Sequence, residues 1–249
     1  MSRTWIVVPC YNEASRLPGD EFSRFVSQNP EVHVLFVDDG STDATPARLS
    51  EIAGSNPKAF DVISEPSNRG KAEAVRRGMN QAFDAGARYA GYWDADLATP
   101  LAEIPHFIAT LDADPSLEAL FGSRVQLLGR TIQRDAVRHY LGRVSATAIS
   151  LTLGLPVYDT QCGAKLFRAS PDCRALFAEP FLTRWVFDVE ILARMLEAQR
   201  GSGGPGPAET VREVPLSEWR DVAGSKVAPL DFFRCLQELV RIYRRHLRG

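Results

Sequence analysis

Long apolar runs are scarce in this sequence. The longest stretch without a charged residue, residues 144–158, is interrupted by Gly154 and Pro156. It is shorter than the roughly 20 apolar residues that a membrane-spanning helix needs. No secretory signal precedes the first strand-like segment, Trp5–Val8. The sequence alone leaves open whether the 144–158 stretch is a core helix or an element that touches a membrane without crossing it.

Cysteine is also scarce, and neither sign of charge dominates. The four cysteines form no CxxC pair and no metal-binding spacing, so we expect reduced thiols in a cytoplasmic protein. With 29 Lys and Arg against 31 Asp and Glu, the formal net charge is -2, and we expect no nucleic-acid partner. The 249 residues, 45% of them hydrophobic, are enough for one large globular domain.

The first half of the sequence alternates between strand-like and helix-like segments. We expect strands at Trp5–Val8, Val32–Val37, Phe60–Ser64 and Tyr89–Trp93, and helices at Asp20–Gln28, Thr45–Ala53 and Lys71–Ala85. Ser41 or Thr42 is available to cap the second helix. This alternation predicts an α/β fold with a mostly parallel central sheet and helices on both faces. Ligands of such sheets bind beyond the carboxyl ends of the strands.

Two acidic residues, Asp94 and Asp96, follow the last of these strands. Alternate residues of an extended chain point the same way, so both carboxylates can face one point. They would repel each other unless a cation lay between them. Mg²⁺ and Mn²⁺ prefer oxygen ligands and often hold substrate phosphates as well. The pair therefore indicates a metal–diphosphate site, with a solvated turn as the alternative because Asp is common in turns.

Polar residues follow the other strands at the same edge. They lie in the segments Pro9–Glu13, Asp38–Asp43 and Asn68–Lys71. An aromatic ring, an amide, a lysine and several carboxylates on one edge are typical of a nucleotide pocket. The GxxxxGK[ST] phosphate loop is absent around Lys71, which is either a charge at the edge of the pocket or an ordinary surface lysine.

Taken in order, these motifs resemble those of family 2 glycosyltransferases, the inverting GT-A type. The resemblance rests on Val8–Glu13, Val37–Asp43, Asn68–Lys71, Asp94–Asp96, Gly122–Arg124, Asp159–Phe167, Arg184–Glu190, and Trp219 with Gly224–Lys226. The later motifs are similar to the polyprenyl-phosphate branch, dolichyl-phosphate β-glucosyltransferases especially. We therefore expect a Rossmann-like GT-A domain at residues 1–229 and a basic amphipathic helix at residues 230–249.

The resemblance implies roles for the residues at matching positions. The nucleoside would contact Pro9, Tyr11, Asn12, Glu13, Val37, Asp38 and Asp39, with Asp39 accepting a hydrogen bond from the base. The sugar and a diphosphate bound to Mg²⁺ or Mn²⁺ would lie on Asp94, Ala95 and Asp96, with Lys71 at the edge. Arg124 would lie beside the transferring phosphates, or else form a surface ion pair. Arg220 and Lys226 would close over the diphosphate. Trp185 and Phe187 are expected to pack in the core.

Basic residues recur at helical spacing in the second half and again near its end. The first group is Arg130, Arg134, Arg138, His139 and Arg143; the second is Arg234, Arg241, Arg244, Arg245 and Arg248. The second group lies opposite an apolar face made of Phe232, Phe233, Leu236, Leu239, Val240, Tyr243 and Leu247. The first group is either a solvated helix face or a surface that attracts the head of a phosphorylated lipid acceptor. The C-terminal helix either lies in an anionic membrane interface, at about 1 kcal/mol per basic residue near the surface, or packs on the protein body. For each group, both interpretations stay open.

The function we expect is metal-dependent inverting transfer of a hexose from a nucleotide diphosphate sugar to a polyprenyl phosphate. UDP-glucose is favoured as donor over GDP-mannose through the resemblance, and the enzyme would be cytoplasmic or peripheral on the inner face of the cell membrane. A hydroxyl acceptor would need a general base, for which Asp188 or Glu190 is the candidate. A phosphate acceptor would not, because it is largely dianionic near neutral pH. The alternatives are transfer to a hydroxyl, a nucleotidyltransferase, and a nucleotide-sugar binder without turnover.

Overall fold

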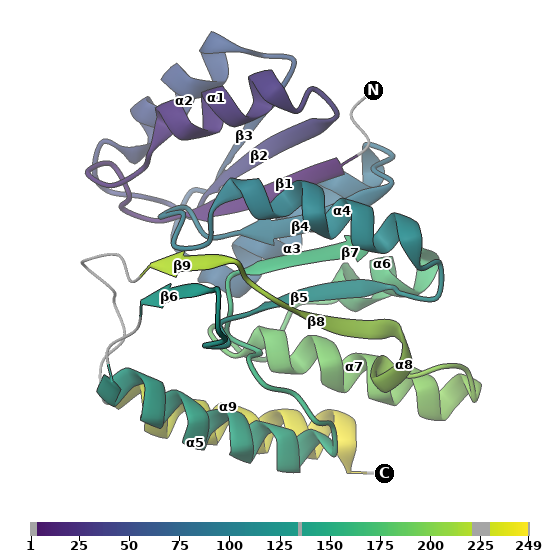
Figure 1. Cartoon of the computed structure of the whole chain (residues 1–249). Coiled ribbons are helices and arrows are strands. Elements are labelled where there is room, and N and C mark those ends of the chain that lie inside the picture. The colour runs from purple at the N-terminus through teal and green to yellow at the C-terminus, as the bar shows by residue number, and fades with distance from the viewer. Residues whose placement is uncertain (1–3, 134–135, 221–229, 249) are drawn as a thin grey trace.

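A seven-stranded sheet forms the centre of the molecule in the computed structural model, which describes residues 4–133, 136–220 and 230–248 (Figure 1). Its strand order is β3-β2-β1-β4-β7-β5-β8. The bounds are β1 Thr4–Cys10, β2 Val32–Asp38, β3 Phe60–Ser64, β4 Tyr89–Trp93, β5 Ala119–Ser123, β7 Ala164–Arg168 and β8 Val211–Pro215. All neighbours pair in parallel except β7, which is antiparallel to both β4 and β5. The predicted mostly parallel sheet is confirmed.

Helices cover both faces of this sheet, as predicted (Figure 1). One face carries α1 Gly19–Gln28, α2 Thr45–Ser55, the short 3₁₀ turn η1 Leu101–Glu103 and α4 Ile104–Ala113; the other carries α3 Lys71–Asp84, α6 Pro171–Ala178 and α7 Phe187–Ser202. A short helix, α8 Pro207–Thr210, leads into β8. Each face buries its own apolar cluster, because these strands are flanked by helices on both sides and carry apolar residues in consecutive positions.

The predicted cap of α2 is wrong. Its N-terminal flanking residue is Ala44, which makes no side-chain cap. Ser41 instead accepts a hydrogen bond from the backbone of Asn12 at 2.9 Å, and the Thr42 amide donates to the Asn12 side chain at 2.9 Å. These residues therefore join the loop after β1 to the loop after β2, which is how the site at this edge is held together.

A second layer, which local patterns did not place, lies beneath α7. It consists of α5 Ala136–Leu153, α9 Leu230–Ile242 and the π-helical turn η2 Tyr243–Leu247, which lie side by side in Figure 1 and contact α7. Two short strands, β6 Thr131–Gln133 and β9 Glu218–Arg220, pair in parallel next to this layer. The figure shows the N-terminal ends of α5, α7 and α9 at the same edge as the carboxyl ends of β1, β2 and β4.

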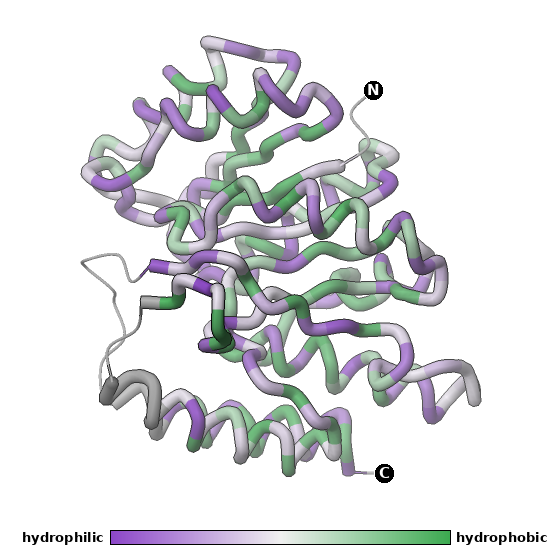
Figure 2. Tube along the Cα trace, viewed as in Figure 1, coloured by the Kyte–Doolittle hydropathy of each residue, from purple (hydrophilic) through white to green (hydrophobic). Residues whose placement is uncertain are grey.

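The apolar face predicted for the C-terminal helix is divided between two sides. Of that face, Leu239 is buried, whereas Leu236, Val240 and Tyr243 are 39%, 48% and 45% exposed. Ile242, which was not assigned to the face, is also buried. Figure 2 shows hydrophobic and hydrophilic residues interleaved along the coloured parts of α5 and α9. Among the described residues, no helix has both the length and the apolar character needed to cross a membrane.

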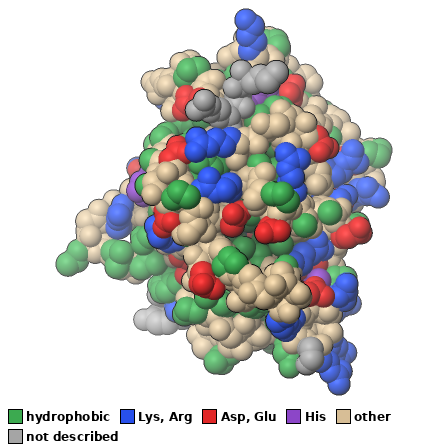
Figure 3. Space-filling model, turned by 90° about the vertical axis from the view of Figure 1, so that its right-hand side faces the viewer, with side chains coloured by type: hydrophobic (Ala, Val, Ile, Leu, Met, Phe, Trp, Pro, Cys, Tyr) green, Lys and Arg blue, Asp and Glu red, His purple; other side chains and the backbone are tan. Residues whose placement is uncertain are grey.

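The distribution of charged side chains and the state of the four cysteines agree with the composition of the sequence. Figure 3 shows acidic and basic side chains interspersed over the face that it presents, as the small net charge implies. All four cysteines are free thiols, and Cys10, Cys162 and Cys173 are buried.

Candidate active site

The acid pair lies in a tight turn directly after β4. The Asp94 amide donates to the carbonyl of Gly163 at 3.0 Å, and the Leu97 amide donates back to the Asp94 carbonyl at 3.2 Å. Leu97 adopts a positive φ of 51°, which is uncommon for a residue with a side chain. The Asp96 carboxylate accepts from the amide of Ala98 at 3.1 Å. The turn thus fixes the backbone of both acids at the carboxyl edge of the sheet.

A basic side chain lies beside each acid. Lys71, the first residue of α3, places Nζ 2.5 Å from Asp94 Oδ1. Arg16 places Nη1 3.9 Å from Asp96 Oδ2 and also binds Glu13. Lys71 is thus paired with the acid turn and is not an ordinary surface lysine. Sequence reasoning missed Arg16, although its position three residues after Glu13 was a local sign of an ion pair.

These contacts shift the proton affinities at the site. Burial raises the pKa of Asp96, and the neighbouring Asp94 carboxylate raises it further. For Lys71, burial works in the opposite direction, but the charges of Asp94 and then Asp188 outweigh it and raise the pKa of the ammonium. Lys71 and Arg16 therefore remain positive at neutral pH and compensate the acid pair.

The residues here fit a metal that shares its ligands with a substrate. Among the described residues there is no cluster of three or more His, Cys, Asp or Glu side chains able to hold a metal ion. Two carboxylates, Asp94 and Asp96, are what the protein offers. Mg²⁺ is commonly bound through one or two carboxylates with the remaining ligands from phosphates and water. This donor set suits a divalent ion whose coordination is completed by a diphosphate.

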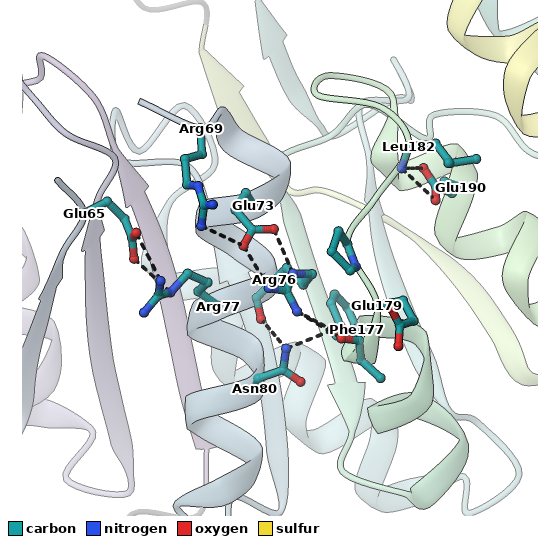
Figure 4. Close-up of polar contacts among 12 residues, drawn as sticks. Glu65, Arg69, Glu73, Arg76, Arg77, Asn80, Phe177, Glu179, Leu182 and Glu190 are labelled. Atoms are coloured by element: carbon teal, nitrogen blue, oxygen red, sulfur yellow. Dashed lines mark hydrogen bonds and ion pairs between the residues drawn. The ribbon is translucent and has the colours of Figure 1, made fainter. Parts of the chain in front are cut away.

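Helix α3 holds Lys71 in place because it is fastened along its length. Arg76 donates to the Ala178 carbonyl of α6 at 3.0 Å, and Asn80 donates to the Phe177 carbonyl at 2.8 Å. Figure 4 shows the contact of Asn80 with Phe177 together with the Glu73 carboxylate, which binds Arg76 on the same helix. These contacts therefore hold α3, and with it the Lys71 side chain in its first turn, in place.

The loops after β1 and β2 form the side of the site where the nucleoside residues were predicted. Pro9 and Val37 are register partners in neighbouring parallel strands, which places Pro9–Glu13 next to Val37–Asp39. Asp39 accepts from the amides of Arg69 and Gly70 at 2.7 and 2.8 Å. Burial raises the pKa of Asp39 even though these two donors oppose the shift.

Because Gly70 has no side chain, the loop before α3 can lie close to both Asp39 and Arg184. It has a φ of 97°, and a Cβ there would lie 2.8 Å from Nε of Arg184. Arg184 in turn donates to the Asn68 side chain at 2.9 Å. The loop before α3 is therefore clamped between the end of β2 and the segment before α7.

Arg124 follows β5 and is held in a buried ion pair. Its guanidinium binds Asp159 through two contacts of 2.6 and 2.7 Å, and lies 5.3 Å from the Trp219 ring. The two side chains are 14% and 8% exposed, so the alternative of a surface ion pair is wrong. Burial lowers the pKa of Arg124, but the Asp159 carboxylate outweighs it and raises the pKa overall.

The two candidate general bases are both engaged. Asp188, in the first turn of α7, accepts from the Tyr92 hydroxyl and lies 2.7 Å from Nζ of Lys165. Burial and then the charge of Asp188 raise the pKa of Tyr92. Glu190 accepts from the Leu182 amide at 2.9 Å (Figure 4). It also pairs with Arg194 at 2.9 Å. Of the two, Asp188 is the one whose charge acts on Lys71.

The remaining predicted residues have mixed outcomes. Arg220 is 67% exposed and pairs with Glu218, while its amide donates to Ala98 just beyond the acid pair. Phe187 is buried as expected, but the expectation of core packing is wrong for Trp185, which is 49% exposed. Outside the described residues lie Gly224–Lys226, Arg134, and the side chains of Arg138, His139, Phe232 and Phe233.

Comparison with known proteins agrees with this geometry. Residues 5–174 match the model of the family described as Glycosyl transferase family 2. The dolichyl-phosphate beta-glucosyltransferase ALG5C of Trichomonas vaginalis is 31% identical over 251 residues, covering 96% of this chain and 70% of the relative.

Two solved glycosyltransferases share the fold. A mannosyltransferase from Pyrobaculum calidifontis, solved with GDP-Man and Mn²⁺, is 18% identical with a TM-score of 0.64; the match covers 99% of this chain and 64% of that one. Glucosyl-3-phosphoglycerate synthase from Mycobacterium tuberculosis, solved with Mn²⁺, UDP and its product, is 19% identical with a TM-score of 0.65, covering 98% and 80%. The fold is thus the GT-A type. With the family model matching most of its length, the chain belongs to glycosyltransferase family 2 and is a glycosyltransferase.

Proposed function

We propose that this enzyme transfers glucose from UDP-glucose to the phosphate of a polyprenyl phosphate, with inversion at the anomeric carbon. The observation that carries the proposal is the acid pair Asp94 and Asp96, held at the carboxyl edge of the sheet beside Lys71 and Arg16. The curated relative that acts as a dolichyl-phosphate β-glucosyltransferase supports glucose as the sugar and a lipid phosphate as the acceptor. GDP-mannose is the competing donor, because one fold neighbour was solved with it.

The donor's diphosphate would bind between the acid pair and the two basic side chains. Bound to Asp94 and Asp96, Mg²⁺ or Mn²⁺ would neutralise charge that builds on the departing diphosphate, an effect worth several kcal/mol. Lys71 and Arg16 would exchange their carboxylate partners for phosphate oxygens. Both side chains are only partly buried, at 27% and 23% exposed, so this exchange requires no opening of the core.

The nucleoside would lie against the loops after β1 and β2. Tyr11 supplies an aromatic ring there, and Asp39 supplies a buried carboxylate whose two oxygens already bind backbone amides. Each carboxylate oxygen accepts more than one hydrogen bond, so Asp39 retains capacity for a base N–H. Asn12 and Asp38 would act by shaping these loops, since Asn12 binds Thr42 and Asp38 binds the Ser41 amide.

The engagement of both candidate bases favours a phosphate acceptor over a hydroxyl. Asp188 is tied to Lys165 and Tyr92, and Glu190 is tied to Arg194 and the Leu182 amide. A hydroxyl needs a base free to take its proton, whereas a phosphate monoester attacks as an anion. We propose that Arg124 assists by presenting positive charge near the acceptor, with Asp159 holding its guanidinium plane.

A transfer assay with matched acceptors tests the proposal. Purified protein is given UDP-glucose or GDP-mannose with Mn²⁺, and either undecaprenyl phosphate, dolichyl phosphate or 3-phosphoglycerate. The expected product is a β-linked glucosyl phosphate lipid, identified by mass spectrometry and by the anomeric coupling in NMR. A product formed only on 3-phosphoglycerate would overturn the lipid assignment.

The metal assignment has its own test. Asp96→Ala should lower turnover by about 10³-fold, because several kcal/mol of charge stabilisation are lost and each 1.4 kcal/mol is tenfold. Asp84→Ala removes an exposed carboxylate at the end of α3 and serves as the matched control. Undiminished turnover in the Asp96 variant would refute the metal site.

A further inference from the structure

A lysine is buried in the middle of the sheet. Lys165 lies on β7, opposite Tyr92 of β4 and Phe121 of β5, and its side chain is 0% exposed. Its ammonium lies 5.3 Å from the Tyr92 ring and 4.8 Å from the Phe121 ring. Burying a charge in such surroundings is costly unless it is paired and hydrogen-bonded. The position therefore indicates a specific task for this side chain.

All three ammonium protons of Lys165 have partners. Nζ donates to the carbonyls of Thr160 and Cys162 at 2.9 and 2.6 Å, and lies 2.7 Å from Oδ1 of Asp188. A lysine ammonium has three donors, so its capacity is used completely. The side chain thus joins the loop before β7 to the first turn of α7, two segments that are distant in sequence.

The loop that Lys165 binds, residues 160–163, also contacts Asp94. Gly163 ends this loop, and its carbonyl accepts from the Asp94 amide at 3.0 Å. A Cβ added to Gly163 would collide with the Asp94 carboxylate, which shows that this side chain lies directly against the glycine. Any displacement of the loop would therefore displace Asp94.

The charged side chains from the edge of the site to the core are Asp94, Lys71, Asp188 and Lys165, and their charges alternate in sign. Lys71 is 2.5 Å from Asp94, and the next carboxylate that acts on Lys71 is Asp188, which is bound to Lys165. The order is negative, positive, negative, positive.

We propose that Lys165 is a positioning residue for the reaction: it fixes Asp94 from behind by bracing the 160–163 loop against Asp188. Its side chain is fully buried and its donors are used within the protein, so its role would be exerted through Asp94 and not by contact with substrate or metal. The inference deepens the proposed function, on which its catalytic consequence rests. Removing the brace weakens donor binding at Asp94 in a way that loss of core stability alone does not.

Four variants test this role. Lys165→Met removes the ammonium but leaves Asp188 buried without its counter-ion, so it should lower the unfolding midpoint strongly. The double variant Lys165→Met/Asp188→Asn leaves no unpaired charge and should recover most of that midpoint. Asp188→Asn alone measures the effect of removing the carboxylate while the Lys165 ammonium stays. Arg168→Met is the matched control, since Arg168 anchors the carbonyls of Leu117 and Leu111 from the other end of β7.

The first readout needs neither metal nor donor. Amide exchange of the Asp94 N–H, which reports its bond to Gly163, is followed by NMR in the metal-free protein. The second readout is KM and kcat for UDP-glucose at saturating acceptor. In the double variant we expect Asp94 exchange to quicken and KM to rise by about 10- to 100-fold, the usual range for residues that orient a ligand from behind. Arg168→Met should change neither.

The outcomes separate the two ideas. If the double variant restores the midpoint and also returns Asp94 exchange and KM to wild-type values, Lys165 serves only charge balance in the core and the proposal is overturned. If the wild-type protein transfers no sugar from any nucleotide, the proposed function fails, but Asp94 exchange still decides whether Lys165 braces the acid turn.

Discussion

Two ion pairs of similar length lie in very different surroundings in this molecule. Lys71 and Asp94 are 2.5 Å apart with side chains 27% and 36% exposed, whereas Lys165 and Asp188 are 2.7 Å apart with side chains 0% and 7% exposed. Solvent screens the first pair and lets a ligand replace either partner. The second pair is desolvated, so opening it would leave a bare charge in the core. Burial, more than distance, separates the solvent-screened pair from the desolvated one.

The same contrast applies to Arg124, which comes from a family motif just as Asp94 does. Its bond to Asp159 is buried, and the Asp159 amide is held in turn by Glu213 at 2.6 Å. Arg124 is therefore part of a fixed, buried pair. Ion pairs at motif positions therefore fall into two groups. An exchangeable pair, such as Lys71–Asp94, is partly exposed, so a ligand can replace one partner; a fixed pair, such as Arg124–Asp159, is buried. The motif does not show to which group a residue belongs.

The largest expected effect is on stability when a fixed pair is broken. Asp159→Asn removes the partner of a buried guanidinium and should lower the free energy of unfolding by about 3–5 kcal/mol. Urea unfolding followed by circular dichroism measures it. Arg212→Met breaks the exposed pair of Arg212 with Asp114, in which Arg212 is 51% exposed, and is the control. Equal losses in the two variants would remove the distinction between fixed and exchangeable pairs.

The next effect is on catalysis through Gly163. Gly163→Ala places a methyl group where the Asp94 carboxylate lies, so we expect turnover to fall about 100-fold, or about 2.7 kcal/mol in the barrier. Transfer from UDP-glucose measures it. Gly54→Ala is the matched control, because no atom lies within 4 Å of the added Cβ and the site is helical. That control should gain about 0.5–1 kcal/mol of stability with unchanged turnover.

Breaking the exchangeable pair Lys71–Asp94 should lower kcat/KM but leave the free energy of unfolding nearly unchanged. Lys71→Met is expected to lower kcat/KM about tenfold through the lost phosphate contact, or about 1.4 kcal/mol. Its free energy of unfolding should stay within about 1 kcal/mol of wild type, as for other partly exposed pairs. Steady-state kinetics and urea unfolding on one preparation give both values. A stability loss as large as that of Asp159→Asn would show that Lys71 is a fixed residue after all.

The smallest effect concerns a pair of intermediate character, the contact of the C-terminal turn with α7. His246 is 6% exposed and lies 2.6 Å from Glu197, which is 44% exposed, and 3.5 Å from the buried Glu190. The bond to Glu190 raises the pKa of His246; burial opposes the shift and Glu197 adds to it. Arg194, Arg200 and Arg245 are the cations that contact the same carboxylates or the His246 carbonyl.

Because the folded pKa of His246 lies above its ordinary value of about 6.5, its stabilisation is complete below that pH. It is lost as the pH rises through the folded value. The melting temperature of wild type should therefore exceed that of His246→Gln most at pH 6, and the gap should narrow towards pH 9. A gap that widens with pH would contradict the assigned charge.

Local sequence patterns predicted the first half of the fold well. The strands Phe60–Ser64 and Tyr89–Trp93 begin and end as expected, and the other five elements predicted before Tyr89 differ by one or two residues at an end. The elements η1, α4 and β5 were not predicted. Short apolar runs that alternate with amphipathic segments are a local signal, and each strand here pairs in parallel with neighbours from the same half. The acid pair was equally visible, because it directly follows a strand.

The missed features depend on segments that are distant in sequence. Strand β7 carries Lys165 in its interior, which breaks the apolar run that marks a buried strand, and it pairs antiparallel with β4 from the other half. Nothing local distinguishes buried Phe187 from exposed Trp185, two residues apart at the start of α7. Arg16 was overlooked because its contact with Asp96 joins loops 80 positions apart.

By itself, the sequence determined the α/β alternation, the parallel N-terminal sheet and the carboxylates at its edge, because these follow from spacing along one continuous segment. Only the tertiary structure decided which charges are exchangeable and which are fixed. That decision depends on how completely other elements remove a pair from water, and desolvation is a property of the packed molecule that no stretch of residues carries alone.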